Sequence, residues 1–203
     1  MSICRELLKE SCKDDCIGNC KCYKYGPNNI DATMRQYLGK RKHKTFKDEN
    51  FRKMAGDIMI EFFNFFEDKV LLWPMFGTLL GIVREGDIIP HDEDIDIGFF
   101  RKDEEKMIKL LDELHNNNGF VIIRNQFKTI YTVWKDGVFI DLYLYEKTAT
   151  EQISQGHRDF YNILKQEAYP FKKIEFRNIQ LNCISKPEIW LERYYGKDWR
   201  TPK

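Results

Sequence analysis

The run Asp94-Ile95-Asp96-Ile97 constrains the fold more than any other part of the sequence, because it alternates acidic and aliphatic side chains. Successive side chains of a β-strand point to opposite faces of its sheet, so the alternation predicts a strand over residues 95–100 with both isoleucines in the core. Asp94 and Asp96 then share the opposite face. Carboxylates that close repel, and the pKa of one rises unless a cation lies between them. The pattern therefore predicts a metal site, with Mg²⁺ or Mn²⁺ as its cation.

A third carboxylate, Asp141, stands alone in an apolar run that predicts a strand over residues 138–145. Burying that charge without a partner would be costly. If this strand lies beside residues 95–100, at the usual spacing of about 4.8 Å, Asp141 reaches the same cation or a second one. Two metal ions bridged by carboxylates form a clamp for in-line displacement at phosphorus. Asp94, Asp96 and Asp141 are therefore the predicted metal ligands and catalytic groups.

A calcium loop and a solvated acidic turn are the alternative interpretations of residues 92–96. A calcium EF-hand that begins at Asp92 needs Gly at its sixth position, where Ile97 stands, and Glu at its twelfth, where Asp103 stands. A solvated turn explains Asp92 but not aspartates interleaved with isoleucine. For Asp141 alone, a salt bridge or a helix cap is the alternative.

A phosphate-binding turn is predicted at Gly77 and Thr78, where a short strand over residues 71–76 turns into a helix over residues 79–84 that Gly86 ends. Backbone N–H groups and a hydroxyl at such a turn face an incoming phosphate, and the helix dipole favours its charge. A Gly-Thr pair is common in proteins, so it indicates a phosphate-binding turn only because it precedes the acidic strand with a helix between them.

Three further residues complete the candidate phosphate- and substrate-binding set. Arg84 offers a planar, permanently charged fork to a phosphate oxygen, with a helix C-terminal charge as the alternative. His91 and Asp92 directly precede the acidic strand and are grouped with it. Together with Gly77 and Thr78, they are expected to contact the substrate.

Hydrophobic periodicity predicts the other elements. Spacing of three and four residues indicates amphipathic helices over residues 50–70, with Asp48 as N-cap, and over residues 103–115. Apolar runs indicate strands over residues 120–124 and 129–134, and Asp136-Gly137 predicts a hairpin turn into residues 138–145. From residue 152 onward the chain is expected to be largely helical, with a last helix over residues 188–195 that starts at Pro187.

Composition narrows the class of protein. The 203 residues carry a net charge of +1, which argues against a nucleic-acid binder held by phosphate neutralisation, and 42% of them are hydrophobic, enough for a globular core. The longest uncharged stretch, residues 70–83, is too short for a membrane span. The first ten residues lack the apolar core of a secretory signal, so a cytoplasmic location is expected.

The N-terminal residues 1–47 read as an appendage to a domain over residues 48–203. Five of the six cysteines lie in the first 22 residues, and four of them are spaced so that they could surround a structural Zn²⁺: Cys12, Cys16, Cys20 and Cys22. Unligated thiols in an arm are the alternative. Disulfides would need an oxidising compartment, for which nothing else in the sequence argues.

Two segments resemble the LicD family, which includes fukutin and fukutin-related protein. The first, residues 77–98, reads GTLLGIVREGDIIPHDEDIDIG, and the second, residues 194–199, reads YYGKDW and is followed by Pro202. The resemblance covers about residues 50–203. It implies an α+β nucleotidyltransferase-like fold with a mixed central sheet flanked by helices.

The resemblance also implies an activity. Members transfer a phospho-alcohol, such as phosphocholine or a polyol phosphate like ribitol phosphate, from a CDP-activated donor to a glycan hydroxyl and release CMP. By motif, Gly77 and Thr78 match the phosphate-side turn, Asp94 and Asp96 the metal-binding pair, and Asp141 the third carboxylate. His91 departs from the tryptophan that the family often has at that position. The implied partners are thus a CDP-activated small molecule and a glycan acceptor, with no nucleic acid and no membrane span.

Three other functions fit the same residues. A nucleotidyltransferase would leave NMP on the acceptor, a glycosyltransferase would use Asp-x-Asp for a nucleotide sugar, and a silent module would only bind a nucleotide or a glycan. Four C-terminal aromatic residues either stack on sugars or pack into the core: Trp190, Tyr194, Tyr195 and Trp199.

Overall fold

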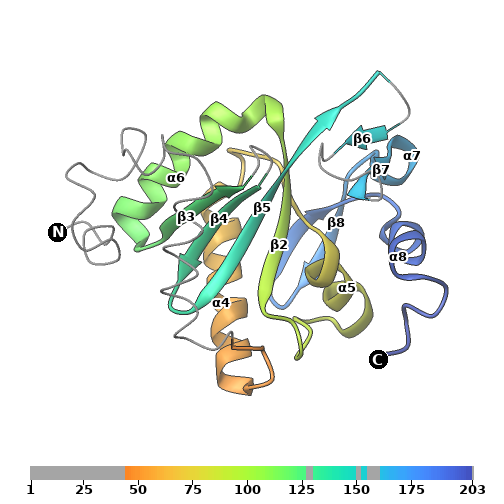
Figure 1. Cartoon of the computed structure of the whole chain (residues 1–203), viewed down its shortest axis with the longest axis horizontal. Helices are drawn as coiled ribbons and strands as arrows, with labels where there is room; N and C mark the ends of the chain where they lie inside the picture. Colours follow the sequence, from red (N-terminus) through yellow and green to blue (C-terminus); the bar gives the residue numbers. More distant parts are fainter. Residues whose placement is uncertain (1–43, 127–129, 150–151, 155–160, 203) are drawn as a thin grey trace.

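The computed structural model describes residues 44–126, 130–149, 152–154 and 161–202. Its centre is a mixed sheet with the strand order β1-β2-β5-β4-β3 (Figure 1). The strands are β1 (Leu72–Pro74), β2 (Asp94–Phe100), β3 (Val121–Gln126), β4 (Ile130–Lys135) and β5 (Val138–Lys147). β2 and β5 are parallel neighbours, whereas the other pairs are antiparallel. Two short strands, β6 (Gln152–Ser154) and β7 (Ile163–Leu164), extend the sheet from β5.

Helices cover both faces of this sheet, as predicted. On one face Ile95 and Ile97 of β2 and Ile140 of β5 are fully buried, in a core shared with α4 (Glu49–Phe66) and α6 (Glu104–Asn118). Burial of each such side chain stabilises the fold by roughly 1.5–3 kcal/mol. The other face belongs to an aromatic-rich core shared with α5 (Phe76–Glu85) and α8 (Pro187–Tyr195), which lie beyond β2 in Figure 1. Because side chains alternate along a strand, the aspartates of β2 and β5 face α5 and α8.

The helix ends follow the predicted signals. Asp48 caps α4, because its Oδ1 atom accepts a hydrogen bond of 2.8 Å from the Phe51 N–H. α5 ends at Gly86 and α6 at Gly119, whose φ angles of 74° and 72° are left-handed conformations that glycine adopts without a Cβ clash. A 3₁₀ turn, η1 (Arg101–Asp103), leads from β2 into α6.

The predicted hairpin between β4 and β5 is confirmed. Asp136 and Gly137 form its turn with φ angles of 49° and 93°, and Lys135 pairs with Val138. The Lys135 Nζ atom also forms an ion pair of 2.6 Å with Glu61 of α4. This contact holds the turn against the helix.

The expectation of a largely helical C-terminal part is wrong. Besides β6 and β7, this part forms a short helix, α7 (Lys165–Ala168), and an antiparallel hairpin of β8 (Lys172–Phe176) and β9 (Ile179–Cys183). The hairpin residues alternate between exposed polar and buried apolar side chains, as the fully buried Phe176 and Cys183 illustrate. That period of two indicates strands rather than a helix. The predicted last helix is confirmed as α8, with Pro187 at its first turn.

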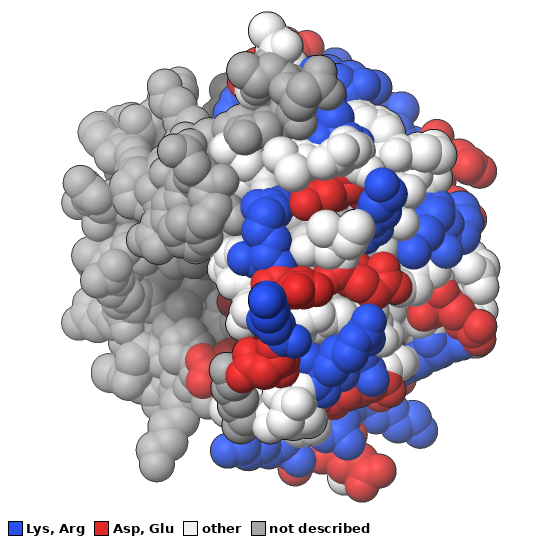
Figure 2. Space-filling model, turned by 90° about the vertical axis from the view of Figure 1, so that its right-hand side faces the viewer, with Lys and Arg blue, Asp and Glu red and all other residues white. Residues whose placement is uncertain are grey.

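The four cysteines of the predicted zinc site, Cys12, Cys16, Cys20 and Cys22, lie outside the described residues, and so does most of the predicted appendage. Within the described parts, no helix is both long and apolar enough to cross a membrane. On the face that Figure 2 turns to the viewer, Lys and Arg alternate with Asp and Glu. The coloured part of this face, which the structure describes, therefore has no broad basic surface of the kind on which a phosphate-backbone binder relies.

Candidate active site

The three predicted carboxylates come together on one face of the sheet. Asp94 and Asp96 are two residues apart on β2, so their side chains share a face, and Asp96 lies beside Asp141 of β5 in the parallel register. Asp96 and Asp141 are each 7% exposed. The prediction that these two strands are neighbours is thus confirmed, and it places an acidic group in the interior of the domain.

A cavity of about 370 Å³ opens on this acidic face. Its acidic wall consists of Asp92, Asp94 and Asp96, and its other walls consist of mostly apolar and aromatic residues from α5, α8 and the segments between: Phe76, Gly77, Leu80, Ile89, His91, Tyr143, Tyr161, Tyr194 and Tyr195. No Lys or Arg stands among these described lining residues. Negative charge at the base of such a cavity favours a ligand that brings cations with it.

Gly77 makes room for a carboxylate at the start of α5. A Cβ atom at this position would overlap the Asp92 side chain, which therefore lies directly over the Gly77 backbone. The preceding Phe76 has a φ of 45°, an unusual conformation for a bulky residue, where the chain turns sharply from β1 into the helix. The first N–H groups of a helix have no intrahelical acceptors, and Gly77 carries one of them at the cavity wall. The predicted phosphate-side turn is thus at the cavity.

Thr78 serves as a link between elements. Its hydroxyl accepts a hydrogen bond of 2.8 Å from the Asp96 N–H, and the Met75 N–H donates to the Asp96 carbonyl at 2.9 Å. Thr78 is 2% exposed and is not among the cavity-lining residues. Its contact fixes the start of α5 against β2 at the residue that carries the central carboxylate.

Thr132 of β4 holds Asp141 and was missed in the sequence. Its hydroxyl donates a hydrogen bond of 2.5 Å to the Asp141 Oδ1 atom, and the two residues are register partners. The hairpin turn at Asp136-Gly137 already implies this pairing, because counting back three residues from Lys135 and forward three from Val138 gives Thr132 opposite Asp141. The signal was therefore present in the predicted hairpin.

Burial and like charge dominate the electrostatics of the site. Burial, followed by the charges of Asp94 and Asp141, raises the pKa of Asp96 well above its ordinary value, and a hydrogen bond with the Tyr143 hydroxyl partly offsets this. Burial also raises the pKa of Asp92, against the lowering effects of the Glu93 N–H and of His91. Tyr143 stays a neutral donor, because burial and the same carboxylates raise its pKa.

The donor set suits a hard divalent cation of the Mg²⁺ type. Such a cation is usually held in phosphate-transfer sites by one or two carboxylates together with substrate phosphates and water. Asp94 and Asp96 line the cavity, and Asp141 stands beside Asp96. Among the described residues, no group of three or more His, Cys, Asp or Glu side chains is placed to hold a metal ion without further ligands. The arrangement resembles an open site that a substrate completes more than a structural metal centre.

Arg84 lies elsewhere. Its Nη1 atom donates to the Trp199 carbonyl at 3.2 Å, and its Nε and Nη2 atoms bond the neighbouring Glu85 carboxylate. It is not among the cavity-lining residues. In this structure Arg84 ties α5 to the C-terminal segment, while His91 and Asp92 lie at the cavity with the acidic strand.

The C-terminal aromatic residues divide between the core and the cavity wall. Trp190 and Trp199 are 0% and 5% exposed and belong to the core. Tyr194 stacks on Trp190 with ring centroids 4.9 Å apart and an interplanar angle of 9°, and it meets the cavity together with Tyr195. Trp190 thus supports the part of the wall that Tyr194 forms.

This architecture has solved counterparts among nucleotidyltransferases. It matches the lincomycin-bound lincosamide antibiotic adenylyltransferase LnuA with a TM-score of 0.50 and 19% identity, over 70% of this chain and 94% of that chain. The antibiotic-resistance factor ANT(2'')-Ia, in its solution structure, gives a TM-score of 0.53 and 12% identity, over 74% of this chain and 75% of that chain. At such identities the likeness defines the fold alone, which is nucleotidyltransferase-like.

The sequence assigns the chain to one family within this class. Residues 69–183 match the family model described as LicD/FKTN/FKRP, nucleotidyltransferase domain, and the chain therefore belongs to the LicD family, as its motifs predicted. An uncharacterized protein of Rickettsia typhi is 31% identical over 133 residues, which are 64% of this chain and 41% of that protein. Ribitol-5-phosphate transferase FKTN of Mus musculus is 26% identical over 180 residues, 84% of this chain and 38% of the relative.

The chain spans less than two thirds of the length of these curated relatives. Family and fold together indicate a transferase, and they leave its reaction open.

Proposed function

We propose that the domain transfers a phospho-alcohol, of the phosphocholine or polyol phosphate type, from a CDP-activated donor to a glycan hydroxyl and releases CMP. The observation that carries the proposal is the pairing of Asp96 with Asp141 on adjacent parallel strands, with Asp94 on the same face of a cavity. The family, and the name of its relative FKTN as a ribitol-5-phosphate transferase, support the choice of transferred group.

Asp94 and Asp96 would hold Mg²⁺ or Mn²⁺, with Asp141 completing the set. When bound, the cation neutralises charge on the donor diphosphate and polarises the phosphorus that is attacked. In the reaction, the acceptor oxygen forms a bond to the alcohol-bearing phosphorus, the bond from that phosphorus to the CMP oxygen breaks, and the acceptor hydroxyl loses its proton. Asp141 is the group assigned to receive that proton. Thr132 orients it for this role by donating to its Oδ1 atom.

Other residues of the chain orient the donor. The Gly77 N–H at the start of α5 lies at the cavity wall beside the Asp92 carboxylate, where it would donate to a phosphate oxygen of the donor. Tyr194 and Tyr195 offer flat apolar surface for a ring of the donor or the acceptor. Catalysis at phosphorus depends mostly on such positioning and on charge neutralisation.

The test measures CMP release from CDP-ribitol and CDP-choline by the purified chain, with Mg²⁺ or Mn²⁺ and with EDTA. Asp96→Asn is expected to lower the rate at least about 100-fold, as removal of a charge-stabilising group does in comparable sites. The matched control is Asp68→Asn, an equally conservative change at an exposed position outside the cavity. Undiminished CMP release by Asp96→Asn would refute the assignment.

Nucleotidyl transfer is the second candidate, because the solved neighbours of this fold include an adenylyltransferase and a complex with adenylyl-2''-tobramycin. The mass of the product separates the two reactions: an acceptor that gains a phospho-alcohol supports the first, and one that gains NMP supports the second. A hexose gain would indicate a glycosyltransferase, and binding without turnover a silent module.

A further inference from the structure

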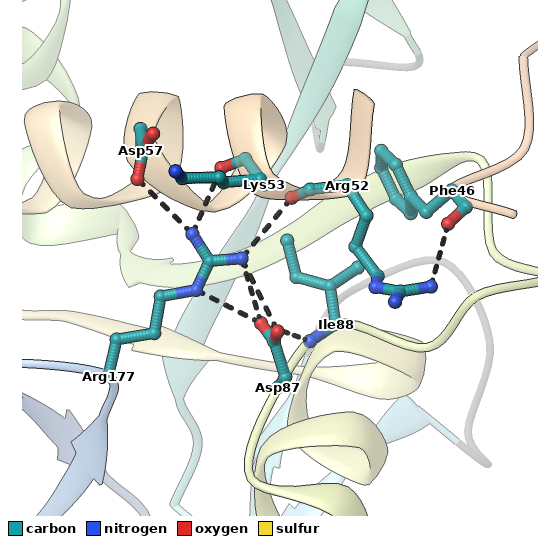
Figure 3. A network of polar contacts seen from close by, with 7 residues as sticks. All are labelled: Phe46, Arg52, Lys53, Asp57, Asp87, Ile88 and Arg177. Atoms are coloured by element: carbon teal, nitrogen blue, oxygen red, sulfur yellow. Dashed lines mark hydrogen bonds and ion pairs between the residues drawn. The ribbon is translucent and has the colours of Figure 1, made fainter. Parts of the chain in front are cut away.

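Arg177 stands at the centre of a polar network outside the cavity (Figure 3). It is the first turn residue between β8 and β9. Its guanidinium forms five hydrogen bonds, to the carbonyls of Arg52 and Lys53 and to the carboxylates of Asp57 and Asp87, at 2.9 to 3.4 Å. A guanidinium has five N–H donors, so every one of them is used.

Two residues break local conformational preferences to make this contact. Arg177 has a φ of 52°, a left-handed conformation that side-chain-bearing residues rarely adopt. Gly56 lies in the interior of α4, where glycine is a poor helix former. A Cβ atom at Gly56 would overlap the Arg177 guanidinium. Because a helical side chain covers the turn before its own Cα atom, the missing one exposes the carbonyls of Arg52 and Lys53. The contacts of the Arg177 side chain thus explain both its own positive φ and the glycine at position 56.

The network ends on the segment that enters the active site. Arg177 donates two parallel hydrogen bonds to the Asp87 carboxylate, and the Asp87 Oδ1 atom accepts a hydrogen bond of 2.9 Å from the Ile88 N–H. The segment of residues 87–93 starts there and carries His91 and Asp92 to the cavity. Its far end is held as well, since the Phe46 N–H donates to the Asp92 carbonyl at 2.9 Å and Arg52 donates to the Phe46 carbonyl at 3.2 Å.

We propose that Arg177 is a positioning residue of the candidate active site: it locks residues 87–93 onto α4, and so fixes His91 and Asp92 at the cavity that Asp94 and Asp96 also line. Arg177 itself is not among the residues that line the cavity. This role needs a planar guanidinium, because one group must donate hydrogen bonds to two carbonyls of α4 and to both carboxylate oxygens of Asp87 at the same time. A lysine ammonium has three donors and cannot reproduce it.

Four variants of the full chain test the proposal. Arg177→Lys keeps the positive charge but removes the planar guanidinium. Gly56→Ala places a methyl group where the Arg177 guanidinium lies, and it also gives α4 a residue of higher helix propensity. Helix propensity alone would make Gly56→Ala more stable, so a loss of order in residues 87–93 cannot be a propensity effect. The controls are Lys173→Ala, on the exposed side of the same hairpin, and Asn64→Ala, on the exposed side of α4.

The first measurement is amide hydrogen exchange of residues 86–93, which depends on no ligand. Arg177→Lys and Gly56→Ala are expected to speed it at least tenfold, with β2 and β5 unchanged, whereas both controls match the wild type. Unchanged exchange in residues 86–93, or an equal acceleration throughout the chain, would overturn the proposal.

The second measurement is the Kd of the full chain for Mn²⁺. This experiment rests on the proposed function, because it assumes a metal site at the cavity. We expect Arg177→Lys and Gly56→Ala to raise it at least fivefold. Mn²⁺ affinity equal to wild type despite faster exchange would overturn the link between the network and the site. If the wild-type chain binds no Mn²⁺, the proposed function fails, and the exchange experiment alone decides whether Arg177 positions the segment.

Discussion

Neutralising Asp96 is expected to stabilise the metal-free protein. Its carboxyl is buried, and the charges of Asp94, Asp141 and Asp92 add to the burial that raises its pKa. A group whose pKa is higher in the folded state binds protons more readily there, so its contribution to stability is greatest at low pH and is lost as the pH rises through the folded pKa. The metal-free wild type should therefore lose stability between mildly acidic and mildly alkaline pH. Asp96→Asn should lack most of this loss.

The magnitude follows from the sheet geometry. Asp141 is on the neighbouring strand, about 4.8 Å away in the sheet, and two unit charges at that separation repel by about 3 to 4 kcal/mol at an effective dielectric constant of about 20. Proton uptake by the wild type already relieves part of this repulsion. We therefore expect Asp96→Asn to gain about 1–3 kcal/mol at pH 8, or about 2–4 °C in Tm for each kcal/mol in a domain of this size.

The assay is thermal unfolding of wild type, Asp96→Asn and the control Asp68→Asn at pH 5.5, 7 and 8, in EDTA and in Mg²⁺. A bound cation stabilises the native state by about 2.7 kcal/mol at a hundredfold excess over its Kd, so Mg²⁺ should raise the Tm of the wild type and of Asp68→Asn but not of Asp96→Asn. A fall in the Tm of metal-free Asp96→Asn at pH 8 would refute the reasoning, because repulsion would then not be what the carboxylate contributes.

Three further predictions concern individual contacts. Thr132→Val removes the hydrogen bond to the Asp141 carboxylate, worth about 1.5–3 kcal/mol, so CMP release should slow about tenfold or more; equal rates would remove Thr132 from the site. Gly77→Ala drives a Cβ atom into Asp92 and should abolish turnover, whereas Gly119→Ala, whose Cβ meets nothing, should cost only stability; comparable activities would contradict this. Burial raises the pKa of Cys183 to about 12, so peptide mapping at pH 8 should find it unlabelled by iodoacetamide until the protein unfolds.

The elements that sequence alone predicted well are those specified by local signals. α4, α5 and α6 have both an apolar stripe and a terminal residue that ends or caps them, such as Asp48 or Gly119. The β8–β9 hairpin offered neither an Asn-Gly nor an Asp-Gly turn. Its turn begins with Arg177, a residue that rarely adopts a positive φ, so nothing local marked it. The contacts of that arginine with α4 explain the conformation, and they lie more than a hundred residues away in the sequence.

The candidate site shows the same division. The carboxylates of β2 and β5 were predictable, because alternation along a strand assigns each side chain to a face. The contacts of Thr78 and Arg84 were not predictable, because the tertiary fold alone brings their partners near. The Thr78 hydroxyl accepts from the Asp96 N–H, and Arg84 donates to the Trp199 carbonyl. Thr132 was predictable in principle, because a two-residue turn fixes the register of every pair beyond it.

Three positions that break local rules are linked to the segments that form the site. Phe76 takes a positive φ where α5 begins at the cavity, Gly77 gives up a side chain where Asp92 needs the space, and Gly56 does so where Arg177 binds. Each choice weakens its own element by about 0.5–2 kcal/mol relative to an ordinary residue. The two glycines admit the side chains of Asp92 and Arg177, which belong to or hold residues 87–93, and Phe76 stands at the sharp turn into α5. A chain selected for stability alone would have little reason to keep all three, so the connection of each to a segment that lines the cavity supports its being the functional site.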